Sequence, residues 1–137
     1  MTKKVIIGLV VTPVVLLVIA VIALGIQVVS KDITQKSLLK SAAEQMETPT
    51  GYTITKTGYV GVVKGFASGS YYYVVYESTS TRAYVEDLTA ELQKLGYTTQ
   101  ENNPFKLTGT FRGQDIKISI NDRSDTVLEV HWDILAL

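Results

Sequence analysis

The sequence predicts an α+β protein, with a single N-terminal transmembrane helix followed by a small two-layer domain. Val5–Val29 contains no charged residue. At about 1.5 Å per helical residue, this run is longer than the roughly 30 Å hydrocarbon core of a bilayer. After residue 50, several stretches alternate apolar and polar residues, which is typical of an antiparallel sheet with one buried face. The expected order is strand-strand-helix-strand-strand-strand, with about five strands covered on one face by the helix.

The N-terminal part divides into a short basic head, residues 1–4, and the transmembrane helix, residues 5–29. The apolar run is longer than the roughly 7–15-residue core of a signal peptide, and no small-x-small cleavage site follows it. We therefore expect an uncleaved anchor whose partner is the lipid bilayer. Lys3 and Lys4 directly precede the helix, as in a signal-anchor. This arrangement predicts a single-pass protein of the cell membrane with its C-terminal domain outside the cytoplasm.

Residues 30–50 continue with helix-forming residues and a weak apolar stripe, so they predict a juxtamembrane helix or stalk. Pro49 and Gly51 should end this helix, because the residue before proline avoids helical backbone angles and glycine favours a turn. The segment is interpreted either as a stalk or as a helix of the domain's first layer.

Residues 51–137 are expected to form the extracytoplasmic α+β domain. The stretches Tyr52–Phe66 and Tyr71–Glu77 predict a hairpin, and glycines within the first indicate a bulge or a close backbone approach. Tyr71–Glu77 is apolar or aromatic on both faces, which favours a central strand with tyrosines on one face. Arg82–Leu95 has the spacing of an amphipathic helix, with an N-cap expected in Ser78–Thr81 and a C-cap at Gly96.

The C-terminal part predicts an antiparallel meander. Phe105–Arg112, Ile116–Ile120 and Leu128–Ile134 each alternate apolar and polar residues, and Gly113 and residues 121–125 indicate the turns between them. The helix at 82–95 is the expected cover of the apolar side.

Composition excludes several classes of function. The formal net charge is zero and the basic residues are dispersed, so nucleic acid is not an expected partner. The sequence contains no cysteine, which removes disulfides and thiolate chemistry. It also lacks a phosphate-binding glycine motif followed by a helix, and no cofactor is expected.

His131 is the one histidine, and alternation places it between Glu129 and Asp133 on the polar face of a strand. A row of three such side chains is about 13 Å long, so it does not chelate one ion without help from another strand, and no metal site is expected. No G-x-S-x-G nucleophile elbow accompanies the histidine. The predicted protein is therefore not an enzyme, although one that uses carboxylates and His131 stays open as a second alternative.

Eight tyrosines gather mainly around the first hairpin, and Tyr71, Tyr73 and Tyr76 are the candidate binding residues. Tyrosine offers a large contact area at low entropic cost. The sequence therefore favours a non-enzymatic interaction or scaffold module with a protein partner, anchored in the membrane. A small-ligand or lipid-binding domain is the first alternative. The chain does not resemble a type IV pilin, because its apolar helix contains no acidic residue.

Overall fold

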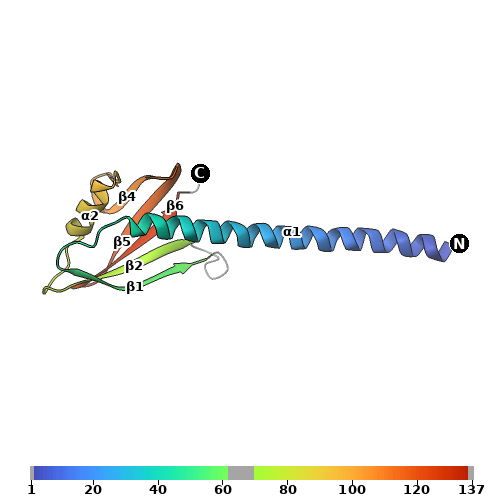
Figure 1. Ribbon diagram of the computed structural model, residues 1–137, viewed down its shortest axis with the longest axis horizontal. Coiled ribbons are helices and arrows are strands. Elements are labelled where there is room, and N and C mark those ends of the chain that lie inside the picture. The colour runs from blue at the N-terminus through green and yellow to red at the C-terminus, as the bar shows by residue number, and fades with distance from the viewer. Residues whose placement is uncertain (1, 62–69, 136–137) are drawn as a thin grey trace. The chain divides into compact units, whose positions relative to one another are not determined.

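The computed structural model describes the backbone of residues 2–61 and 70–135, and side chains for 13–24, 33–61 and 70–135. The element order is α1 (Thr2–Glu44), β1 (Tyr52–Val60), β2 (Tyr71–Ser78), α2 (Val85–Lys94), β3 (Thr98–Gln100), β4 (Asn103–Phe111), β5 (Gln114–Ser124) and β6 (Val127–Ile134). The chain has two compact units, residues 1–34 and 35–137 (Figure 1). The fold is α+β, as the sequence predicted.

In the first unit, α1 continues through Pro13 as a helix. Among the residues that the structure describes, no helix is both long enough and apolar enough to cross a membrane. The predicted transmembrane helix Val5–Val29 is therefore not supported by the structure. Residues 5–12 and 25–29 of that prediction lie outside the described side chains.

In the second unit, six antiparallel strands form one sheet in the order β1-β2-β6-β5-β4-β3. The predicted hairpin and the predicted meander are both present, and β2 joins them by pairing with β6. The sixth strand, β3, was not predicted because it is only three residues long. β2 has a partner on each side, which confirms it as a central strand.

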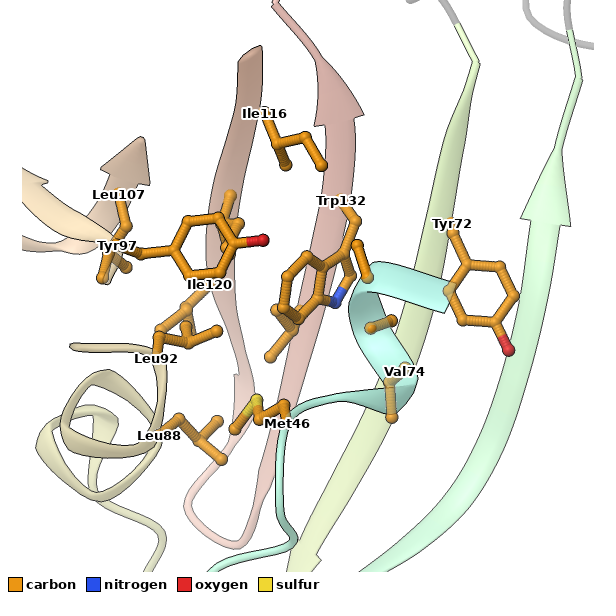
Figure 2. Close-up of a cluster of buried hydrophobic side chains, with 14 of the residues drawn as sticks. Met46, Tyr72, Val74, Leu88, Leu92, Tyr97, Leu107, Ile116, Ile120 and Trp132 are labelled. Carbon is orange, nitrogen blue, oxygen red and sulfur yellow. The ribbon is translucent and has the colours of Figure 1, made fainter. Parts of the chain in front are cut away.

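One face of the sheet carries the hydrophobic core. Its strand residues pack against α2 and against the last turns of α1, and Leu39 of α1 is fully buried in the same cluster. Figure 2 shows Trp132 in the middle of the cluster, with Tyr97 on one side and Tyr72 on the other. The tryptophan has no exposed surface and meets Tyr97 edge-on, with 5.7 Å between ring centroids. The end of α1 is thus a second helical cover, beside the predicted one.

The start of α2 differs from the prediction. The helix begins at Val85, after Tyr84 as its N-cap residue, and no side chain of Tyr84 caps it. The serines that were expected to cap the helix bond to each other instead. Ser78, the last residue of β2, and Ser80 share a hydrogen bond of 2.9 Å. The C-cap prediction is confirmed, because Gly96 has a φ of +96° and its N–H donates to Gln93.

Candidate interaction site

A groove of about 650 Å³ lies between the last turns of α1 and the hairpin formed by β1 and β2. Its lining comes from three consecutive segments of the second unit: Lys36, Lys40, Ala43, Glu44, Met46, Thr48, Ile54, Thr57, Gly58, Tyr59, Tyr72, Val74 and Tyr76. The groove is partly open to solvent, because residues on its helix side and on β1 are exposed.

The periodicity of α1 explains the helix wall of the groove. Residues of one stripe, at i, i+3, i+4 and i+7, are buried against the sheet: Leu39, Ala42, Ala43 and Met46. The neighbouring stripe, at i, i+4 and i+8, borders the groove: Lys36, Lys40 and Glu44. Two alanines in the buried stripe present little side-chain bulk toward the sheet. The last turns of α1 therefore supply both a core contact and a charged rim.

β1 forms the opposite wall, and among the described strands it pairs with β2 alone, at the edge of the sheet. Ile54 lies opposite the buried Tyr76, so its side chain belongs to the core face of the sheet, yet it is 48% exposed. The register shifts between Ile54 and Lys56, and this bulge brings Thr57 onto the same face, opposite Val74. Thr57 is exposed as well. Between the buried Tyr52 and the partly buried Tyr59, the core face of β1 is thus left uncovered at Ile54 and Thr57.

The outer edge of β1 adds backbone chemistry to this wall. A strand at the edge of a sheet presents a row of N–H and C=O groups that no neighbouring strand takes up. Gly58 allows a close approach on the open face, because the ring of Tyr73 lies where a side chain would be: a Cβ at this position would meet the Tyr73 hydroxyl at 2.5 Å. The sequence predicted a bulge or a close backbone approach at the glycines of this stretch. Gly58 is such a close approach, and the bulge lies between Ile54 and Lys56.

The floor of the groove is built on β2. Tyr76 is 1% exposed, and its hydroxyl donates to Met46 Sδ at 3.5 Å. Burial, followed by the influence of Tyr72, raises the pKa of Tyr76 to about 12. Tyr72 and Val74 are buried on the same face. The floor is consequently aromatic and stays uncharged at neutral pH.

The three tyrosines predicted as binding residues do not share a surface. Tyr71 and Tyr73 are half-buried on the open face of the sheet, whereas Tyr76 points into the core. Tyr76 lies on the opposite face from Tyr71 and Tyr73, because alternation along β2 separates even from odd positions. Only Tyr76, with its neighbour Tyr72, lies near the groove.

The open face holds a separate cluster of polar and aromatic side chains. The His131 ring stacks on Tyr71 with 4.4 Å between centroids, and His131 Nε2 is hydrogen-bonded to Glu129 Oε1 at 2.7 Å. Arg123 Nε donates to the other oxygen of Glu129 at 2.7 Å. Burial acts against ionisation of Glu129, but these two hydrogen bonds lower its pKa below the usual value.

Asp133 completes the row on β6. Burial raises the pKa of Asp133, against the opposing effect of His131 and Lys117. In the part of the chain that the structure describes, no three histidine or acidic side chains are grouped to hold a metal ion. Among the described residues, His131 contacts the Glu129 carboxylate and the Tyr71 ring, and neither contact supplies a nucleophile.

Charge at the groove is concentrated on its helix wall. Lys40 Nζ and Glu44 Oε1 are 3.9 Å apart, and both side chains are more than half exposed. Such a surface pair contributes little to stability, about 0–1 kcal/mol. Lys36 has no ion-pair partner among the described residues. As far as the described side chains show, the rim of the groove therefore carries an unpaired Lys36 and a weakly paired Lys40.

Sequence reasoning missed this groove. Ile54, Thr57 and Tyr59 were expected in a strand, but nothing in their spacing shows that the helical cover ends before them. The signal for the helix wall was the weak apolar stripe after residue 30, whose small residues made it resemble a stalk.

The chain matches no protein-family model, and no curated protein or solved structure is significantly similar to it.

Proposed function

We propose that the protein is a membrane-anchored, non-enzymatic interaction module, displayed outside the cytoplasmic membrane, that binds an extended segment of a partner protein along β1. The observation that carries the proposal is the uncovered core face of this edge strand, beside the groove. Strand addition uses such an edge, because main-chain hydrogen bonds give affinity and pockets for alternate side chains give specificity.

The groove provides such a pocket. Every second side chain of an added strand would point toward the core face, where Ile54 is 48% exposed and the tyrosine floor begins. Covering Ile54 removes apolar surface from water, at about 25 cal/mol per Å². The partner segment thus gains both backbone pairing and apolar contact at one place.

The anchor and the location of the module are supported by the sequence of Val5–Val29 and by Lys3 and Lys4 before it. Protease treatment of intact cells tests both. The domain should be digested without lysis, and a fragment containing the first residues should stay with the membrane after alkaline extraction. Protection of the domain in intact cells would reverse the orientation, and release of the chain at alkaline pH would contradict the anchor.

A photo-cross-linking amino acid at position 54 of the full chain tests the binding site in living cells. The matched control carries the same group at position 53, which is also exposed but lies on the other face of β1. We expect cross-links to a polypeptide from position 54, few from position 53, and loss of the cross-links when Thr57→Asp places a negative charge on the core face. Equal cross-linking from both positions would contradict a specific site.

The volume of the groove favours one alternative, a small-ligand-binding domain, because about 650 Å³ lies within the usual range of ligand pockets. Such pockets bury roughly 70–90% of their ligand. Here Lys36, Ile54 and Thr57 are exposed along the groove, which suits a strand lying across it better than an enclosed small molecule. Small apolar molecules that compete with the position-54 cross-link would favour the alternative.

A further inference from the structure

We infer that the segment bound along β1 is acidic, with at least one carboxylate that reaches Lys36 and Lys40. This inference rests on the proposed function and specifies the chemistry of its partner. The sequence of β1, YTITKTGYV, contains one basic residue and no acidic residue. The charged side chains on and beside β1 therefore decide which net charge an added strand should carry.

Lysines lie on both sides of the edge. On the core face, Lys36 and Lys40 line the groove. On the open face, Lys56 Nζ lies 5.9 Å from the centroid of the Tyr73 ring. An added strand points its side chains alternately to these two faces. Carboxylates on either face of that strand would meet a cation.

Among the described residues, Glu44 is the carboxylate that lines the groove, and it does not cancel these cations. Glu44 competes for Lys40, but at 3.9 Å and with 63% of its side chain exposed it is easily displaced. Glu77 is opposite Thr53, at the beginning of β1 and away from the groove. Lys36 has no ion-pair partner among the residues whose side chains the structure describes. The groove thus offers a cationic rim above an uncharged aromatic floor.

The same charges disfavour a second copy of this chain as the occupant. If β1 of one molecule paired with β1 of another, the added strand would bring a lysine and no carboxylate. Like charges that lie opposite each other in a sheet are destabilising. An acidic segment of another protein has the complementary charge, and its extended backbone matches the free edge.

The test uses the full chain in phosphatidylcholine nanodiscs and a displayed library of random nine-residue peptides. Selection runs in parallel on two variants. Ile54→Lys removes the exposed apolar side chain from the core face, and Thr53→Lys is a matched exposed change on the other face. Unfolding midpoints of both variants establish that they fold. We expect peptides that are enriched on the parent and on Thr53→Lys but not on Ile54→Lys, with aspartate and glutamate about threefold above the starting library.

Selected peptides are then synthesised with glutamate and with glutamine. The glutamine version should bind about two- to fivefold more weakly per lost ion pair. This difference should disappear in the double variant Lys36→Gln, Lys40→Gln. Glu44→Gln should increase affinity for the acidic peptide, because it removes the competing carboxylate from Lys40.

The outcomes separate the two proposals. Ile54-dependent peptides without acidic enrichment would overturn the acidic partner and leave strand binding intact. No Ile54-dependent peptide would overturn both. Self-association of the parent chain that Ile54→Lys abolishes would identify a second copy as the occupant, against the inference.

Discussion

The hydroxyl of Tyr52 connects the start of β1 to the start of α2, so Tyr52→Phe should destabilise the domain while leaving its core packing intact. The hydroxyl accepts a hydrogen bond from the backbone N–H of Tyr84 at 2.8 Å and donates to Asp87 Oδ2 at 2.7 Å. Tyr84 is the N-cap residue of α2 and has no side-chain cap of its own. A tyrosine from a strand therefore satisfies the N–H of the N-cap residue, which in a capping box is paired with a glutamate or glutamine at position N3.

The expected cost follows from the two lost bonds. An unpaired buried N–H costs about 1–3 kcal/mol, and a hydrogen bond to a charged group contributes about 1.5–3 kcal/mol. Asp87 is exposed and its carboxylate regains water, so the second contribution is mostly recovered. We expect a loss of about 2 kcal/mol in the free energy of unfolding, which lowers the melting temperature by about 8–16 °C for a domain of this size.

Urea unfolding of the full chain in mild detergent measures this loss, with the fluorescence of Trp132 as the reporter because it is the one tryptophan and is fully buried. Tyr71→Phe is the matched control, since its hydroxyl has no hydrogen bond among the described residues. Equal midpoints and slopes for Tyr52→Phe and the parent chain would refute the capping role.

Three further predictions use the same unfolding assay. Leu39→Ala should cost about 2–5 kcal/mol, because Leu39 has no exposed surface; a loss below 1 kcal/mol would mean that the end of α1 is dispensable to the core. Gly109→Ala should cost about 1–3 kcal/mol, because the new Cβ would lie 2.5 Å from the ring of Tyr97, which Trp132 holds in place; an unchanged midpoint would show that the ring moves aside. The contribution of Tyr76 to stability should be constant from neutral pH to pH 10 and fall by about 2–3 kcal/mol as the pH rises to 12, because the pKa of Tyr76 is about 12 in the fold and about 10 when unfolded. Tyr52 and Tyr97, whose pKa values are also raised, add to the fall, so Tyr76→Phe should reduce it; an equal fall in Tyr76→Phe would contradict this origin.

The sequence predicted those elements whose signals are local. The meander followed from period-two alternation, and its buried residues are the expected ones, such as Ile116, Ile118 and Val130. Gly113 was expected at a tight turn, and it follows Arg112 with φ angles of +77° and +50°, as in a two-residue hairpin turn. Phe105 differs, because it is 39% exposed near the start of β4.

Features that depend on distant partners were not predictable. The hairpin at β3 turns at Glu101 and Asn102, both with positive φ, and this pair lacks the glycine that usually indicates such a turn. The cap of α2 comes from Tyr52, 32 positions earlier in the chain. Pairing of β2 with β6 joins segments that no local pattern relates. In each case the stabilising group is far away in sequence.

The width of the sheet explains why a binding groove exists at β1. Six strands at about 4.8 Å spacing make a sheet roughly 24 Å wide, which is wider than two helices packed about 8–10 Å apart can cover completely. Since α2 contacts β3 and β4, and the end of α1 takes the next place, the uncovered strand must be at the opposite edge. The exposure of Ile54 and Thr57 is the consequence. A partner strand that lies on this edge would complete the second layer, so binding would extend the same packing that folds the domain.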